Sequence, residues 1–176
     1  MNKVMQKAAH IKLLALDVDG VLTDGRLYFS EDGGELKTFD TQDGHGIKML
    51  QQSGVVCAII TGRTTTLVER RTRNLGVAHL LQGREDKLAA LKELTAQLGM
   101  ALKDVAYMGD DWPDLPAVLA AGFGVSVANA HKELLLRADY VTTLAGGCGA
   151  VREVCDLLLK AQHNYDAALA PYLHRE

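Results

Sequence analysis

The sequence predicts an α/β protein with a doubly wound, mostly parallel, Rossmann-like sheet. Short apolar runs typical of buried strands alternate with amphipathic helical stretches along almost the whole chain. Such an alternation is typical of a parallel sheet with helices on both faces. The chain has 176 residues, the size of one domain. We therefore expect a single domain over residues 1–176.

The predicted elements follow one another in that rhythm. The strand-like runs are residues 12–18, 55–60, 78–81, 104–108, 123–127 and 139–142. The helical stretches are residues 43–53, 64–75, 84–99, 113–121, 130–136 and 149–162. A glycine in the left-handed conformation often ends a helix, and this position is expected for Gly54, Gly76, Gly99 and Gly122.

One segment, residues 25–39, departs from this rhythm and predicts a small β-hairpin insertion. Two short strand-like runs flank Glu31-Asp32-Gly33-Gly34, and Asp-Gly-Gly readily supplies the positive φ of a hairpin turn. A free two-stranded ribbon should not expose this much apolar surface. Packing on the parent domain is one explanation, but we favour pairing with other subunits through Leu27, Phe29, Leu36 and Phe39.

The C-terminal segment, about residues 163–176, is interpreted as a tail in which Pro171 ends any helix. The net charge of −3 argues against binding nucleic acid through bulk charge. No apolar stretch approaches the roughly 20 residues of a membrane helix, and the first ten residues lack the apolar core of a secretory signal. Three cysteines without CxxC spacing suggest inert thiols. We expect a cytoplasmic protein without a nucleic-acid or membrane partner.

The most informative motif lies at the end of the first predicted strand. The apolar run Leu13–Leu16 leads into Asp17-Val18-Asp19-Gly20. Burying ionised carboxylates is costly unless a metal or other cations receive them. We therefore expect Asp17 and Asp19 at the carboxyl edge of the sheet, where open α/β sheets bind ligands.

Three further polar groups are expected at or near the same edge. Thr61 ends an apolar run just before a helical stretch, where a hydroxyl suits a phosphate oxygen. Asp110, together with Asp17, could hold a hard Mg²⁺ ion. Lys87 supplies a cation against the crowded negative charge, and Asp19 is placed to relay a proton. The pattern predicts a site for magnesium and phosphate.

Other motifs with related residues do not match. A calcium-binding loop beginning at Asp17 would need an acid or amide at its fifth place and Glu at its twelfth, where Val21 and Tyr28 stand. The chain has no GxxxxGK[ST] motif and no complete dinucleotide fingerprint. Carboxylate chemistry is the remaining interpretation.

Four motifs follow one another along the chain: Asp17-Val-Asp19, Thr61-Gly-Arg63, Lys87, and Gly109-Asp110-Asp111 with Asp114. In this order they resemble the motifs of the haloacid-dehalogenase-like phosphatases. The resemblance implies that Asp17 is a nucleophile that forms an aspartyl-phosphate. It implies that Asp19 is first the general acid and then the general base, and that Thr61 and Lys87 hold the phosphoryl group.

The same resemblance implies the metal ligands. Asp17, the Asp19 carbonyl and Asp110 would bind Mg²⁺, while Asp111 or Asp114 would support the ion through water. Because an aspartate before a helix is often only an N-cap, the helix-capping alternative stays open for the two supporting residues.

Three further stretches resemble a narrower family, the 3-deoxy-D-manno-octulosonate 8-phosphate phosphatases of lipopolysaccharide biosynthesis. They are residues 40–48, 138–142 and 146–153. This resemblance implies a homotetramer without a mobile cap domain, in which hairpins assemble the subunits and neighbours help to close each site. It implies that the phosphorylated sugar acid contacts Asp19, Asp40, Thr41, Gln42, Asp43, Gly44, Lys48, Arg63, Arg71 and Lys87.

Two alternatives remain. One is a phosphatase with the same chemistry that acts on a nine-carbon sugar-acid 9-phosphate. The other is a non-catalytic oligomerisation module of a nucleotidyltransferase, which the four intact motifs disfavour. Two departures from the family pattern are Cys148, where arginine is expected more often, and Trp112-Pro113, which should alter only the entry into a helix.

Overall fold

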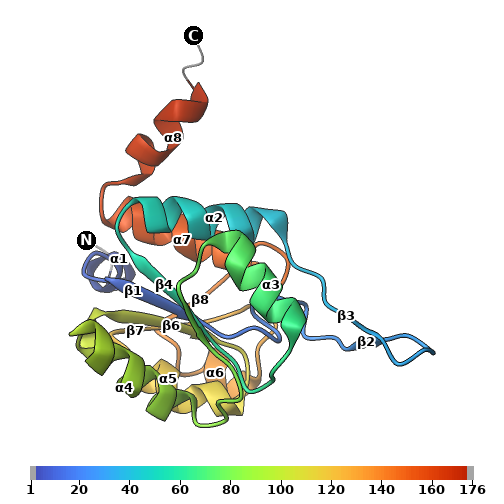
Figure 1. The fold of residues 1–176 in the computed structure, drawn as a ribbon. Helices are drawn as coiled ribbons and strands as arrows, with labels where there is room; N and C mark the ends of the chain where they lie inside the picture. Colours follow the sequence, from blue (N-terminus) through green and yellow to red (C-terminus); the bar gives the residue numbers. More distant parts are fainter. Residues whose placement is uncertain (1–2, 174–176) are drawn as a thin grey trace.

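The computed structural model describes residues 3–173. Its centre is a six-stranded sheet in the order β5-β4-β1-β6-β7-β8, with every neighbouring pair parallel (Figure 1). The strands are β1 (Leu13–Leu16), β4 (Val56–Ile60), β5 (His79–Leu81), β6 (Val105–Gly109), β7 (Phe123–Ser126) and β8 (Tyr140–Val141). The predicted fold class and all six strands are confirmed.

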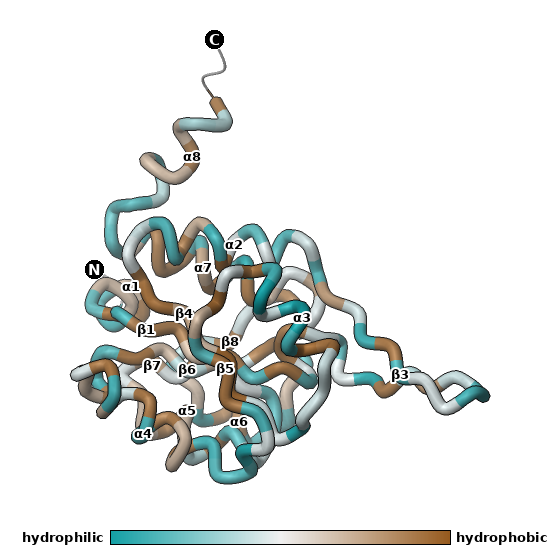
Figure 2. Tube along the Cα trace, viewed as in Figure 1, coloured by the Kyte–Doolittle hydropathy of each residue, from teal (hydrophilic) through white to brown (hydrophobic). Residues whose placement is uncertain are grey.

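Helices cover both faces of this sheet (Figure 1). One layer holds α1 (Lys3–Ala8), α2 (Thr41–Gln52), α3 (Thr66–Leu75) and α7 (Ala150–Ala161). The other holds α4 (Lys87–Leu98), α5 (Leu115–Ala120) and α6 (Lys132–Leu135). Burial on both faces explains why β1 is an uninterrupted apolar run, whose four residues are fully buried. Figure 2 shows the same pattern as hydrophobic segments along the central strands.

The predicted helices are confirmed, with shifts at their ends. The stretch predicted at 84–99 begins at Lys87 because the Asp86 side chain caps the helix, accepting a hydrogen bond from the backbone N–H of Ala89 at 2.9 Å. The stretch predicted at 113–121 divides into a short 3₁₀ turn, η2 (Trp112–Asp114), and α5. Pro113 lies in the first turn of η2, as expected from its restricted φ.

Three of the four predicted helix-ending glycines are confirmed. Gly54, Gly76 and Gly99 have φ values of 95°, 68° and 64°. The prediction for Gly122 is wrong, because this residue is not among those with positive φ. A Cβ atom there would lie 2.0 Å from the carbonyl oxygen of Lys103, so the glycine permits a close backbone approach instead.

The predicted hairpin is also present. β2 (Tyr28–Phe29) and β3 (Glu35–Leu36) are antiparallel and project from the body of the molecule (Figure 1). Leu27, Phe29 and Leu36 are 51%, 69% and 66% exposed. Phe39 differs from the expectation of exposure, because it is partly buried against the core. No cap domain is inserted anywhere in residues 3–173.

The prediction that Pro171 ends any helix in the C-terminal tail is wrong. Residues Tyr165–Leu173 form α8, and Pro171 lies inside this helix rather than ending it. Proline removes one backbone donor, and here it does so in the last turn, where little helix remains to be disrupted. The tail's last three residues, 174–176, lie outside the described residues.

The thiol prediction is confirmed for two cysteines, since Cys57 and Cys155 are buried, while Cys148 is exposed. Burial raises the pKa of the Cys57 thiol to about 12. Among residues 3–173, no helix combines the length and the apolar character needed to cross a bilayer.

Candidate active site

The central strands of the sheet deliver polar residues to one edge. Asp17 follows β1, Thr61 follows β4 and Asp110 follows β6, and these three strands are neighbours in the order β4-β1-β6. Because the strands are parallel, their carboxyl ends meet at the same edge. Thr61 is buried, and its main chain bonds to Leu81 and Arg84, which fixes its position at the end of β4.

A buried ion pair network forms the centre of this edge. The Lys87 Nζ atom lies 2.8 Å from Asp17 Oδ1 and 2.9 Å from Asp114 Oδ1. Lys87 is the first residue of α4, so the start of that helix brings the ammonium group to the end of β1. All three side chains are less than 10% exposed. The network therefore joins two predicted catalytic residues, Asp17 and Lys87, to Asp114, a residue predicted only as supporting.

Asp114 has more partners than its predicted supporting role requires. Its Oδ1 atom also accepts a hydrogen bond from the Tyr107 hydroxyl at 2.8 Å. Its Oδ2 atom accepts from the backbone N–H groups of Asp110 and Asp111, at 3.1 and 3.4 Å. Asp111 itself is exposed and acts as the N-cap of η2, accepting from the backbone N–H of Trp112. Asp114 thus holds the loop after β6 in place.

Three carboxylates gather where a cation would be needed. Oxygens of Asp17, Asp110 and Asp114 all lie within 4.8 Å of one another. Gly20, with φ +89°, permits this approach, because a Cβ atom there would lie 2.0 Å from Asp110 Oδ2. The absence of a side chain at Gly20, three residues after Asp17, therefore leaves the space that the Asp110 carboxylate occupies.

The electrostatics of the cluster favour a bound cation. Burial, reinforced by the charge of Asp114, raises the pKa of Asp17 to about 8, even though Lys87 opposes the shift. Burial, followed by the charges of Asp114 and Asp111, raises the pKa of Asp110 to about 7. One ammonium group thus faces three carboxylates. A hard divalent ion that prefers oxygen ligands fits this donor set.

Asp19 has a partner that the sequence analysis missed. Its carboxylate is paired with the Lys37 ammonium group, and Lys37 Nζ also lies 3.7 Å from Glu35 Oε1. Glu35 Oε2 in turn accepts a hydrogen bond from Arg63 Nη2 at 2.9 Å. Alternation along a strand places residues 35 and 37 on one side and Leu36 on the other, a signal that could have found both residues.

The predicted substrate residues at the start of α2 have mixed environments. Thr41 and Gln42 are exposed. The Asp40 carboxylate caps α2 by accepting from the backbone N–H groups of Gln42 and Asp43. The Asp40 carbonyl oxygen accepts a hydrogen bond from Arg71 Nη2 at 2.9 Å. Arg71 also stacks over the Phe39 ring, 5.5 Å from its centroid.

Two other predicted substrate residues are less well placed for direct contact: Asp43 is buried, and Lys48 lies away from the carboxylate cluster. Asp43 is 1% exposed, and its Oδ1 atom accepts from the backbone N–H of Arg152 at 2.8 Å, so it caps α7. Burial raises the Asp43 pKa to about 6. Gly44 allows Arg71 to pack against the α2 backbone. Lys48 is exposed and lines a separate groove between α2 and α3.

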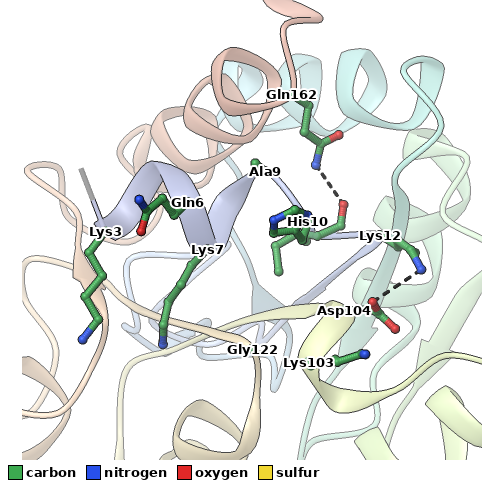
Figure 3. Close-up of a pocket in the computed structure, with 11 residues that line it drawn as sticks. Lys3, Gln6, Lys7, Ala9, His10, Lys12, Lys103, Asp104, Gly122 and Gln162 are labelled. Carbon is green, nitrogen blue, oxygen red and sulfur yellow. Dashed lines mark hydrogen bonds and ion pairs between the residues drawn. The ribbon is translucent and has the colours of Figure 1, made fainter. Parts of the chain in front are cut away.

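A separate cavity lies at the opposite edge of the sheet. It has a volume of about 1090 Å³ and is lined by residues that precede β1, β6 and β7, including Lys12, Lys103 and Gly122 (Figure 3). Lys12 pairs with Asp104 at 3.4 Å, and Gln162 donates to the Ile11 carbonyl oxygen at 2.8 Å. These contacts tie the N-terminal segment to the body. The cavity is separate from the carboxylate cluster.

Comparisons with known proteins agree with this geometry. The family model described as haloacid dehalogenase-like hydrolase matches residues 76–152. The 3-deoxy-D-manno-octulosonate 8-phosphate phosphatase KdsC of Escherichia coli (strain B / BL21-DE3) is 53% identical, covering 94% of this chain and 88% of the relative.

Solved structures show the same likeness. The Moraxella catarrhalis 3-deoxy-D-manno-octulosonate 8-phosphate phosphatase, in complex with magnesium ion, phosphate ion and KDO, superposes with a TM-score of 0.96 at 53% identity, covering 98% of this chain and 99% of the other. The cobalt-bound deoxy-D-mannose-octulosonate 8-phosphate phosphatase from Haemophilus influenzae gives 0.89 at 39% identity, covering 92% and 95%.

The parallel sheet and the carboxylate cluster at its edge define a hydrolase of the haloacid dehalogenase-like class. Within that class, the chain belongs to the family of 3-deoxy-D-manno-octulosonate 8-phosphate phosphatases.

Proposed function

We propose that this protein is a Mg²⁺-dependent phosphatase that hydrolyses 3-deoxy-D-manno-octulosonate 8-phosphate to the free sugar acid and phosphate in lipopolysaccharide biosynthesis. The observation that carries the proposal is the buried contact of Lys87 with Asp17 and Asp114, beside Asp110. The names of the relatives support the substrate. The expected cellular location is the cytoplasm.

In the proposed mechanism, one Asp17 oxygen attacks phosphorus while Asp19 gives a proton to the departing sugar oxygen. The bond between phosphorus and that oxygen breaks, and an aspartyl-phosphate forms on Asp17. Asp19 then takes a proton from water, which attacks phosphorus and releases inorganic phosphate. In this second step the bond between the Asp17 oxygen and phosphorus breaks, so only the two steps together return Asp17 to a free carboxylate and Asp19 to its protonated form.

Two further residues act on the phosphoryl group in this proposal. The Lys87 ammonium group neutralises its negative charge, and the Thr61 hydroxyl donates a hydrogen bond to one of its oxygens. Asp17, Asp110 and the Asp19 carbonyl would hold Mg²⁺, supported by Asp114 or Asp111. When bound, the ion supplies positive charge that polarises the phosphate and keeps Asp17 ionised.

We assign recognition of the sugar acid to residues around the hairpin base and α2. Arg63, Arg71 or Lys48 would bind the sugar carboxylate through charge-assisted hydrogen bonds. The remaining proposed contacts are Asp19, Asp40, Thr41, Gln42, Asp43, Gly44 and Lys87. Among these, the buried Asp43 is best suited to an indirect role, because it holds α7 against α2.

The proposed assembly is a homotetramer formed through the hairpins. Leu27, Phe29 and Leu36 expose apolar surface on a projecting element, and burial of such surface in an interface is favourable. A nine-carbon sugar-acid 9-phosphate is the alternative substrate. A non-catalytic module is the other alternative, which the complete carboxylate cluster disfavours.

Phosphate release, measured across a panel of eight- and nine-carbon acid phosphates with and without Mg²⁺, tests this function. We expect the highest kcat/KM on the eight-carbon substrate, and no turnover after chelation or in Asp17→Asn. The exposed Asp166 provides a matched control, and Asp166→Asn should retain wild-type turnover. A preference for the nine-carbon acid would identify the alternative substrate, while wild-type turnover by Asp17→Asn would exclude the mechanism.

A further inference from the structure

The hairpin has one face turned toward the protein's own candidate active site. Leu36 is 66% exposed on the outer side, while the side chain of Lys37, the next residue, is 2% exposed. Glu35 and Lys37 therefore lie on the inner side, as the alternation of strand side chains requires. The hairpin that exposes Leu36 on one side therefore places the buried Lys37 ammonium group beside Asp19 on the other.

The contacts of Lys37 form a short chain of alternating charge. Its ammonium group is paired with the Asp19 carboxylate and lies 3.7 Å from Glu35 Oε1. Glu35 continues the chain to Arg63 at 2.9 Å. The chain links three segments: the loop after β1, the hairpin and the loop after β4.

The pair with Asp19 matters because that carboxylate is otherwise lightly constrained. The Asp19 side chain is 27% exposed, and in residues 3–173 Lys37 is the side chain that the structure records as its hydrogen-bond and ion-pair partner. Without a partner, a carboxylate at this exposure would sample several rotamers, because holding it in one rotamer costs conformational entropy. The nearly buried Lys37 fixes its direction.

We infer that Lys37 is a positioning residue that holds the Asp19 carboxylate in the orientation needed for proton transfer to the leaving oxygen, with Glu35 tying Lys37 to Arg63. The inference rests on the proposed phosphatase function. It means that the hairpin of each subunit contributes to proton transfer in that same subunit. Proton transfer by a positioned group typically contributes about 10²–10⁴-fold to rate, so loss of its alignment should cost a measurable part of this factor.

The experiment compares two small aryl phosphates, phenyl phosphate and p-nitrophenyl phosphate, which lack a sugar and so remove any effect of Lys37 on sugar binding. The value of kcat/KM reports the steps up to release of the leaving alcohol. Phenol is the poorer leaving group and depends more on protonation by Asp19. We expect Lys37→Met to lower kcat/KM about 10-fold or more for phenyl phosphate, and less than about 3-fold for p-nitrophenyl phosphate.

A double-mutant cycle shows whether Lys37 acts through Asp19. In an Asp19→Asn background, Lys37→Met should cause no further loss, because the group that it positions has lost its function. Lys37→Arg keeps the charge and should restore most of the leaving-group selectivity. Lys92→Met, at an exposed lysine of α4, is the matched control and should behave like the wild type.

The outcomes separate this inference from the proposed function. Failure of the wild-type protein with Mg²⁺ to release phosphate from 3-deoxy-D-manno-octulosonate 8-phosphate as well as from both esters would overturn the phosphatase function. Wild-type turnover combined with equal losses on both esters, or additive losses in the double mutant, would overturn only the positioning role. Unchanged melting temperature and gel-filtration volume of Lys37→Met would exclude misfolding as the cause of its loss.

Discussion

The stability of a Lys87→Met variant tests whether the Lys87 ammonium group compensates the buried charges of Asp17 and Asp114. The Lys87→Met change keeps an unbranched side chain of similar length but removes the only ammonium group recorded against Asp17 and Asp114 within residues 3–173. Both carboxylates remain buried, at 9% and 1% side-chain exposure. They must then either stay ionised without a partner or take up protons.

The expected loss of stability is large. Removing one partner of a buried ion pair costs about 3–5 kcal/mol. For a protein of this size, each kcal/mol corresponds to about 2–4 °C in Tm, so the melting temperature should fall by about 6–20 °C. The loss should be smaller in acid, where the carboxylates protonate. Excess Mg²⁺ should restore part of it by supplying positive charge to the same cluster.

Thermal unfolding followed by circular dichroism, in chelator and in Mg²⁺, measures this effect. Lys92→Met is the control from the same helix, and its exposed position predicts a change within about 0.5 kcal/mol. Turnover of Lys87→Met should fall about 100-fold or more, since electrostatic stabilisation of the transferring group is lost. If Lys87→Met melts within about 2 °C of the wild type in chelator at alkaline pH, the electrostatic reasoning fails.

Three further predictions follow from the same structure. Since folding raises the pKa of Asp17 to about 8 and that of Asp110 to about 7, the metal-free folded protein binds more protons than the unfolded chain. Its Tm should therefore fall from about pH 6 to about pH 8 and depend less on pH in Mg²⁺; a rising Tm would refute this. Phe29→Asp should reduce the oligomer size in gel filtration, whereas Glu31→Lys on the same hairpin should not, and an unchanged Phe29→Asp volume would exclude hairpin assembly. Asp43→Ala should lower the unfolding free energy in urea by about 1–2 kcal/mol through loss of the α7 cap, while Asp43→Asn keeps an acceptor and should lose less; equal losses would argue against the cap.

The three central strands, β1, β4 and β6, could be predicted from sequence because each is a continuous apolar run. Parallel strands covered on both faces give continuous apolar runs, as in Leu13–Leu16. The two terminal helices, α1 and α8, were not predicted from sequence. α8 has no buried residue within its described part, so its sequence carries little of the periodicity that identifies a packed helix. Pro171 also suggested that a helix would end there, whereas α8 continues through it to Leu173.

The site was predictable where residues act through their position at strand ends, and less so where they act through distant contacts. Asp17 and Asp110 follow apolar strands, so their meeting at one edge follows from topology. The pairing of Lys37 with Asp19 depends instead on how the hairpin folds back. Asp43 caps a helix that begins more than 100 residues later in the sequence, a contact that no local pattern reveals.

The central claim is that Asp17 briefly carries the phosphoryl group, and trapping that group tests it most directly. Protein turning over 3-deoxy-D-manno-octulosonate 8-phosphate with Mg²⁺ can be quenched in acid and treated with borohydride, which reduces an aspartyl-phosphate to homoserine. Peptide mass spectrometry should find homoserine at position 17, and only when substrate is present. Full phosphate release with aspartate unchanged at position 17, or with homoserine at another position, would contradict the account.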